Sequence, residues 1–289
     1  MVKRLRDIPY PIGIPGRLAS EVRLGVPLGP SASPEIELAE HDIDGAAIRA
    51  ASVRGLLHRN RGTERQDAFS CAWRAERSSL LIAVADGVGS RSRSREASAA
   101  AVRVAADAWS LEDTTLGELV QRANAHLLEH TVIGESGFPL GGTTLTLVEV
   151  SIVDGVIGPG HIAWVGDSPV WVLSGGAWSE ATASAVAGDA FAAPIDALPS
   201  ARAVVQFATL PGGADSIFVM TDGVGVPLRN SHEVRQALAS WWADAPGIYT
   251  FGGQVEFARQ SFQDDRTVVG VWSAATADPD GVAASRDAI

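Results

Sequence analysis

The sequence predicts an α+β protein in which antiparallel strands outnumber helices. Nine short apolar runs have the length and composition of β-strands. Glycine-containing turns such as "VDGVIGPG" join several of these runs, which favours antiparallel hairpins. Helical patterns are few and occur in blocks, so the chain lacks the strict strand–helix alternation of a parallel sheet.

The nine predicted strands are bounded mostly by turn residues. They span residues 46–54, 68–74, 80–85, 143–150, 161–165, 169–173, 201–210, 216–220 and 266–272. With 289 residues, 46% of them hydrophobic, the chain is long enough for one large domain or two small ones.

Four helices are predicted from capping residues and apolar spacing. Ser94 is a plausible N-cap for the first helix, and Thr115 with Glu118 forms a capping box for the second. Ser231 can cap the third helix, and the fourth is expected at about residues 254–262. The third helix turns an apolar stripe toward the core, made of Val234, Leu238, Trp241 and Trp242.

Composition divides the chain into three parts. Residues 1–45 contain six prolines and several glycines, which predicts an extended N-terminal arm. Residues 46–273 form one continuous body without internal repeats, and residues 274–289 lack apolar periodicity and are expected to form a flexible tail.

Charge and cysteine content exclude several classes of protein. The net charge of −11 argues against a nucleic-acid-binding or anionic-membrane surface, and the basic run "RSRSR" at 91–95 is interpreted as a solvated loop. The single cysteine, Cys71, excludes an internal disulfide and is expected to be a packed core thiol. No signal-peptide pattern and no apolar run of about 20 residues is present, so a cytoplasmic protein is expected.

Carboxylates stand at the ends of several apolar runs. They are Asp67, Asp86, Asp167, Asp222, Asp264 and Asp265. Strand ends of one sheet system can converge, and converging carboxylates repel one another unless a cation is present. Such oxygen ligands favour Mg²⁺, Mn²⁺ or Ca²⁺ over zinc or copper. Taken singly, each Asp-Gly pair is more simply explained as a turn.

Several short motifs occur in the same order as in a known protein family. "VADGVG", "GGTTL", "WVGDS", "VMTDGV" and "DDRTVV", preceded by "RGLLHRNRGTERQDAF", resemble the metal-dependent protein serine/threonine phosphatases of the protein phosphatase 2C family, in its bacterial-type branch. The resemblance covers about residues 48–272. It implies an antiparallel two-sheet β-sandwich flanked by helices on both faces, in four α-β-β-α layers, with a metal site at one edge and residues 46–273 as the catalytic domain.

The resemblance also implies roles for individual residues. Asp86 resembles the carboxylate that contacts two metal ions, with the Gly87 carbonyl as a further ligand. Asp222 and Asp264 look like ligands of one ion, whereas Asp265 stands at a position usually held by Asn and is the poorer candidate. Asp67 is expected to act through metal-bound water.

Other positions resemble peripheral parts of the family site. Asp167 resembles a ligand of a weaker third metal, and the Gly141-Gly142 pair is expected to form a tight turn near the site. The family's phosphate-binding arginine falls at Gly62, so the neighbouring Arg61 is the candidate for that role.

The chain departs from the family pattern at several positions. Gln66 replaces a common Glu, Val88 stands where eukaryotic members have His, and Pro169 replaces an arginine. Val226 occupies the position of a second third-metal aspartate. These departures put the phosphate-binding arginine and the third metal in question more than the two-metal core.

The expected activity is hydrolysis of phosphoserine or phosphothreonine in proteins by a water that bridges two Mn²⁺ or Mg²⁺ ions. The partner is then a phosphoprotein, matched to a serine/threonine kinase in signalling, with no nucleic acid or membrane involved. Two alternatives stay open: a pseudophosphatase that binds phosphopeptides or regulates other proteins, and a purely structural role for the metals. The six histidines form no HExxH pattern and "DGVGS" does not continue as Gly-x-Gly-x-x-Gly, which argues against zinc hydrolases and dinucleotide-binding folds.

Overall fold

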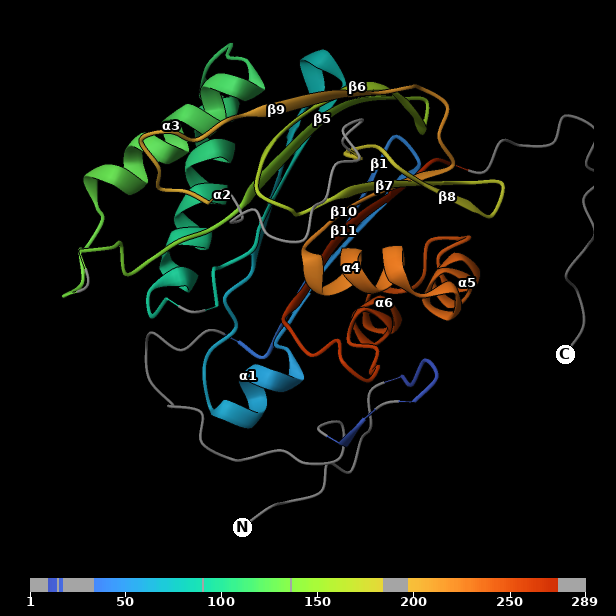
Figure 1. Ribbon diagram of the computed structural model, residues 1–289. Helices are drawn as coiled ribbons and strands as arrows, with labels where there is room; N and C mark the ends of the chain where they lie inside the picture. Colours follow the sequence, from blue (N-terminus) through green and yellow to red (C-terminus); the bar gives the residue numbers. More distant parts are fainter. Residues whose placement is uncertain are drawn as a thin grey trace, which may run out of the picture.

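The computed structural model describes residues 10–14, 16–17, 34–89, 91–135, 137–183 and 197–274. These residues form two antiparallel sheets that pack face to face, with helices on both outer faces (Figure 1). The arrangement confirms the predicted α+β class and the four-layer sandwich.

Six strands form one sheet and five form the other. The six-stranded sheet has the order β1 (Ile36–Ile43), β2 (Ala46–Val53), β11 (Arg266–Trp272), β10 (Ser216–Met220), β7 (Val170–Ser174) and β8 (Ala177–Glu180). The five-stranded sheet has the order β3 (Ala68–Arg74), β4 (Ser79–Ala85), β5 (Leu145–Val153), β6 (Val156–Val165) and β9 (Gln206–Leu210). Every pair of neighbouring strands is antiparallel.

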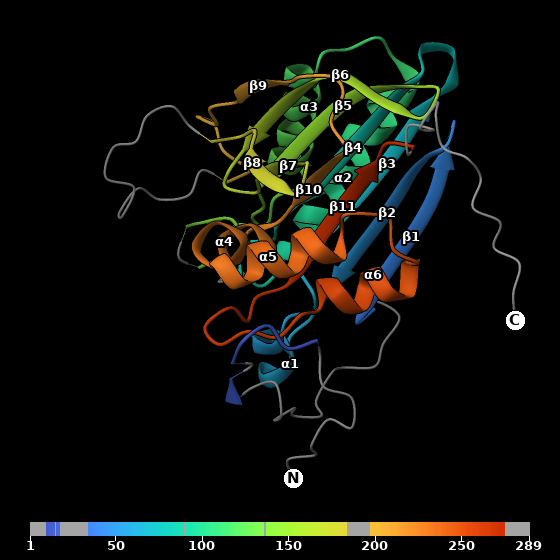
Figure 2. The same ribbon diagram turned by 90° about the vertical axis from the view of Figure 1, so that its right-hand side faces the viewer.

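Helices cover each sheet on its outer face, as the two perpendicular views show (Figure 2). Helices α2 (Ser94–Leu111) and α3 (Leu116–Glu129) pack on the five-stranded sheet. Helices α4 (Asp222–Asn230), α5 (His232–Trp241) and α6 (Ile248–Val255) pack on the six-stranded sheet. The short helix α1 (Leu56–Arg61) lies at the end of the sandwich where β2 ends, and a 3₁₀ turn spans Ala75–Arg77.

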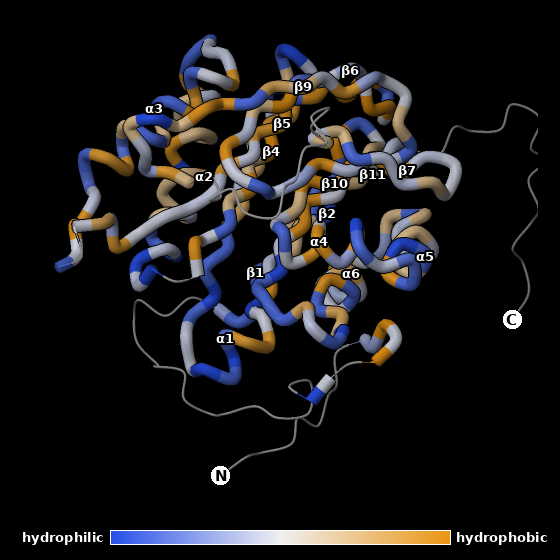
Figure 3. Tube along the Cα trace, viewed as in Figure 1, coloured by the Kyte–Doolittle hydropathy of each residue, from blue (hydrophilic) through white to orange (hydrophobic). Residues whose placement is uncertain are grey.

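Apolar residues fill the three spaces between these layers, and the hydropathy colouring follows them along the strands (Figure 3). All seven residues of β4 are buried, because this strand lies inside its sheet with the other sheet on one face and α2 on the other. Beneath α4, α5 and α6 the core is aromatic, and Phe218 stacks on Trp242 with ring centroids 5.1 Å apart. Rigid strands therefore position the loops at their ends.

The predicted strands are confirmed, three of them with the observed bounds: residues 68–74, 216–220 and 266–272. Two strands were not predicted. Strand β1 falls within the predicted arm, so the sandwich includes residues from 36 rather than from 46. Its residues are mostly exposed because it is an edge strand, and the sequence IELAEHDI consequently lacks an apolar signal. Strand β8 is also an edge strand, of only four residues.

The helix predictions are partly confirmed. The capping box of Thr115 and Glu118 is present, and Ser231 accepts from the Val234 N–H. Ser94 is the first residue of α2 rather than its N-cap, which is Arg93. The helix expected at 254–262 is wrong, because α6 ends at Val255 and the following segment forms a loop.

Two further expectations concern cysteine and membranes. Burial raises the pKa of the Cys71 thiol to about 12, so it stays protonated at neutral pH. Among the described helices, none combines the length and apolar character needed to cross a bilayer.

Candidate active site

Carboxylates from both sheets gather at the end of the sandwich near α1. Asp67 directly precedes β3 and Asp86 directly follows β4, both in the five-stranded sheet. Asp222 opens α4 after β10, and Asp264 lies two residues before β11, both from the six-stranded sheet. After the effect of burial, the charges of Asp67, Asp222 and Asp264 all raise the pKa of Asp86, which shows that the four form one acidic centre.

One side of this centre is saturated by hydrogen bonds from the protein. Asp67 is 3% exposed and its Oδ2 accepts from the hydroxyls of Thr221, at 2.8 Å, and Thr267, at 2.9 Å. Its pKa is raised well above the ordinary value, chiefly by burial and then by the charge of Asp265. Because Thr267 lies in β11 and Thr221 directly follows β10, Asp67 joins the two sheets at this edge.

Asp265 is equally well satisfied. Its Oδ1 accepts from the Gly55 N–H at 2.7 Å, and its Oδ2 from the Gln66 N–H at 2.6 Å. The same Oδ2 lies 2.9 Å from His58 Nδ1. These partners occupy both oxygens of the carboxylate, and the poorer suitability of Asp265 as a metal ligand stays a prediction.

The other side of the centre is unsatisfied. The charge of Asp222 raises the pKa of Asp86, so the two carboxyls lie close together, and burial is the largest cause that raises both pKa values. The pKa of Asp222 rises to about 6, and that of Asp86 lies well above its ordinary value. Asp222 Oδ1 is buried and has no hydrogen-bond partner in the part of the chain that the structure describes. Two carboxyls facing each other in this way share a proton unless a cation replaces it.

Asp264 differs from its neighbour Asp265 in exposure. Its side chain is 55% exposed, and Oδ1 accepts from the Asp265 N–H at 2.9 Å. His58 Nε2 lies 3.9 Å from the same oxygen. The pKa of His58 is raised, because the hydrogen bond and charge of Asp265 and the charges of Asp264 and Asp67 outweigh the lowering effect of burial. A half-exposed carboxylate beside the centre keeps oxygen atoms available to a ligand.

The backbone around Gly87 approaches its neighbours closely. A Cβ at Gly87 would lie 2.7 Å from both Gln66 Cβ and the Gln66 carbonyl oxygen. Gly87 also pairs with Thr143, whose hydroxyl donates to the Asp86 carbonyl at 2.9 Å. Glycine is therefore required after Asp86 for the loop to close over β3.

Asp167 lies on the Asp222 side of the centre, where burial raises its pKa and the nearby Arg229 charge lowers it. Arg229, on α4, forms a two-pronged ion pair with Glu180 at 2.9 and 2.5 Å. Arg61 is exposed at the last position of α1, and no described residue pairs with it.

The residues present fit a divalent metal ion chemically. The donors at the centre are carboxylate oxygens, and a buried oxygen of Asp222 lacks a hydrogen-bond partner within the described ranges. In the described ranges, no three or more His, Cys, Asp or Glu side chains form a ready-made metal cage. Mg²⁺ and Mn²⁺ suit oxygen donors, and Mg²⁺ usually keeps several water ligands, so a few carboxylates per ion suffice.

A comparison with models of protein families identifies the family of this chain. The model of protein phosphatase 2C matches residues 54–246, which include the loops that carry Asp67, Asp86, Asp167 and Asp222. The chain belongs to the protein phosphatase 2C family. Its members are protein serine/threonine phosphatases, and the resemblance stated from the motifs is confirmed.

Solved structures agree with this fold. A bacterial serine phosphatase is 13% identical with a TM-score of 0.58, covering 79% of this chain and 98% of the other. The catalytic domain of PstP, solved with two manganese ions, is 19% identical with a TM-score of 0.55, covering 80% and 99%. MsPP from Mycobacterium smegmatis, solved with cacodylate, is 21% identical with a TM-score of 0.52, covering 81% and 100%. No curated protein sequence matches this chain.

Several residues of the site escaped the sequence interpretation. Three such residues contact the acidic centre: His58 from α1, Thr221 from the N-cap of α4, and Thr267 from β11. Thr221 and Thr267 flank the predicted aspartates in "VMTDGV" and "DDRTVV", and this adjacency was the available signal. Arg229 had no such signal, because its link to Glu180 joins residues 49 positions apart.

Proposed function

We propose that this protein hydrolyses phosphoserine and phosphothreonine in proteins, with two divalent ions, Mn²⁺ or Mg²⁺, at the acidic centre. The observation that carries the proposal is the half-buried pair of Asp86 and Asp222, whose carboxyls lie close together and one of whose oxygens is buried with no partner among the described residues. A structural site has no need to hold two mutually repelling carboxylates. A site that must bind cations and a phosphoryl group does.

The side chains of the acidic centre would have three roles: binding the ions, orienting water and positioning a loop. Asp86, the Gly87 carbonyl, Asp222 and Asp264 would hold the ions, which when bound supply positive charge for the phosphoryl oxygens and lower the pKa of water. Asp67, fixed by two threonine hydroxyls, would orient water at the centre. Asp265 and His58 position the loop that presents Asp264.

Two peripheral roles are proposed on the family resemblance. Asp167 would contribute to a weaker third ion, and the partly buried Arg229 beside it already supplies positive charge there. Arg61, exposed and unpaired among the described residues, would contact the phosphoryl group of the substrate. We also propose a cytoplasmic signalling role opposite a serine/threonine kinase.

Turnover of a phosphothreonine peptide and of p-nitrophenyl phosphate during a Mn²⁺ titration tests the proposal. We expect activity that rises with Mn²⁺ and is lost on chelation. Asp107→Asn, at an exposed position on α2, is the matched control and should behave as the wild type. A pure wild-type protein that binds Mn²⁺ or phosphopeptide without turnover would instead establish the pseudophosphatase alternative.

A further inference from the structure

A cavity of about 370 Å³ lies beside the acidic centre, between the loop after α1 and the start of α2. Gln66 and Gly89 line it on the side of the centre, but Asp67, Asp86, Asp222 and Asp264 do not line it. A group bound in this cavity is therefore not the phosphoryl group that reacts. It lies close enough to belong to the same substrate, since Gln66 precedes Asp67 in the chain.

The cavity carries an excess of positive charge in an otherwise acidic protein. Three arginines of the "RSRSR" run and two glutamates line it. Arg95 forms an ion pair with Glu64 at 2.6 Å, and Arg93 pairs with Glu96. Arg91 has no carboxylate partner among the described residues, and its charge is therefore available to an anion.

Arg91 is held in place rather than extended into solvent. Its Nη1 donates to the Gly141 carbonyl at 3.1 Å, and its side chain is half-buried. A Cβ at Gly142 would lie 2.6 Å from the same nitrogen. The second glycine of "GGTTL" thus leaves space for the guanidinium, which fixes Arg91 before any ligand arrives and lowers the entropy cost of binding.

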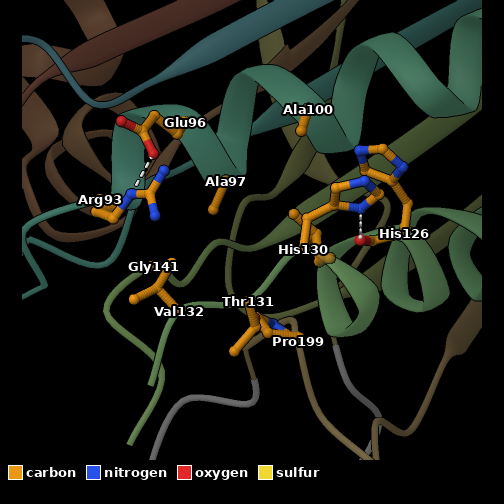
Figure 4. Close-up of a pocket in the computed structure, with 11 residues that line it drawn as sticks. Arg93, Glu96, Ala97, Ala100, His126, His130, Thr131, Val132, Gly141 and Pro199 are labelled. Carbon is orange, nitrogen blue, oxygen red and sulfur yellow. Dashed lines mark hydrogen bonds and ion pairs between the residues drawn. The ribbon is translucent and has the colours of Figure 1, made fainter. Parts of the chain in front are cut away.

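The neighbouring arginine does not offer the same charge. Arg93 also lines a second cavity of about 190 Å³, together with His126 of α3 and His130, which follows that helix (Figure 4). There the dashed contact joins Arg93 to Glu96, so its charge is neutralised by the adjacent turn of α2. Of the arginines in this run, Arg91 is the one placed to recognise an anion.

The cavity also has an unused hydrogen-bond acceptor. The side-chain oxygen of Gln66 is buried and has no partner among the described residues. A backbone N–H of a bound peptide would satisfy this oxygen, and an acidic side chain of the same peptide would satisfy Arg91.

We infer that Arg91 binds an anionic side chain, acidic or phosphorylated, that flanks the scissile phosphoserine or phosphothreonine of the protein substrate. This inference rests on the proposed function and names its substrate class: phosphopeptides with acidic flanks. The run "RSRSR" is then a specificity element rather than a solvated loop.

The test compares phosphothreonine peptides that differ only in carrying Glu, Ala or Lys at the flanking positions. For the wild type, kcat/KM is expected to be about tenfold higher with Glu than with Ala at the preferred position. Arg91→Ala should bring this ratio close to one, and Arg91→Lys should keep part of it. Arg103→Ala, an exposed arginine further along α2, should keep the wild-type ratio.

The outcomes separate this inference from the proposed function. Without wild-type turnover the proposed function fails, and fluorescence-detected binding of the same peptides still measures whether Arg91 selects the acidic flank. Equal kcat/KM for all flanks, or a Glu preference that survives in Arg91→Ala, overturns the inference. An equal loss for every peptide and for p-nitrophenyl phosphate also overturns it, because Arg91 would then contact the reacting phosphoryl group.

Discussion

The two sides of the acidic centre differ in how the protein treats its carboxylates. Asp67 and Asp265 each receive several hydrogen bonds from the protein, so the fold itself satisfies them. The carboxyls of Asp86 and Asp222 lie close together, and a buried oxygen of Asp222 has no hydrogen-bond partner among the described residues. The satisfied carboxylates maintain the geometry, and the unsatisfied ones are available for cations.

The largest expected effect comes from neutralising the unsatisfied side. Asp86→Asn and Asp222→Asn should each lower Mn²⁺-dependent kcat at least ~10²-fold, since each removes a negative charge proposed to hold the cations that stabilise the reacting phosphoryl group. The free energy of unfolding without metal should stay level or rise, because Asn cannot ionise. Turnover assays and urea denaturation in EDTA measure both quantities. A strongly destabilised Asn variant would contradict the distinction between satisfied and unsatisfied carboxylates at the acidic centre.

Removing a carboxylate that the protein satisfies with hydrogen bonds should instead lower the free energy of unfolding. Asp265→Ala leaves the Gly55 and Gln66 N–H groups and His58 without their acceptor, and should lower the free energy of unfolding by about 3 kcal/mol. Urea denaturation of the metal-free protein measures this. An Asp265→Ala variant as stable as the wild type would show that the hydrogen bonds do not hold this loop.

Metal binding should stabilise the protein more at neutral than at acidic pH. The pKa of Asp222 in the folded metal-free chain, about 6, exceeds its ordinary 3.8, so the folded state binds more protons between these values and its stability falls as pH rises. Cations relieve this repulsion but compete with protons below pH 6. At 100 times the dissociation constant, Mn²⁺ should add about 2.7 kcal/mol. Thermal melts with and without Mn²⁺ should show a larger shift at pH 7.5 than at pH 5; an equal shift would refute the linkage.

The smallest effect is expected at Asp264. Because this side chain is half-exposed and accepts only one local N–H, Asp264→Ala should change the free energy of unfolding by less than about 0.5 kcal/mol. Activity should nevertheless fall if Asp264 is a ligand. Urea denaturation of both variants compares Asp264→Ala with Asp265→Ala. Equal losses of unfolding free energy would show that the two neighbouring aspartates do not differ in structural importance.

The sequence predicted the positions of the carboxylates because strand ends are local features. Asp86 follows a fully apolar run, and Asp264 precedes another, so their placement depended on patterns a few residues long. The partners were not predictable in this way: Thr267 reaches Asp67 across 200 positions, and His58 reaches Asp265 across 207. Strand β1 was not predicted, because an edge strand carries polar residues at its exposed positions.

The loop of residues 256–262 shows the same limit. Its apolar residues suggested a helix, but Arg266 holds it in a different form, donating to the Glu256 and Phe262 carbonyls while its guanidinium lies 4.2 Å from the Phe257 ring centroid. Burial lowers the pKa of Arg266 to about 10, and the arginine still remains charged at neutral pH. A tertiary contact from a later strand thus overrides the local helical preference.

The position of the acidic centre across both sheets has a mechanical consequence. Asp86 belongs to one sheet and Asp222 to the other, and Asp67 already ties them through two threonine hydroxyls. Ions shared between Asp86 and Asp222 would act as a reversible crosslink that resists sliding of one sheet over the other. Loss of the ions would release that crosslink at the edge of the sandwich. The carboxylates proposed to bind the catalytic ions would therefore also determine how readily the two sheets separate under mechanical force.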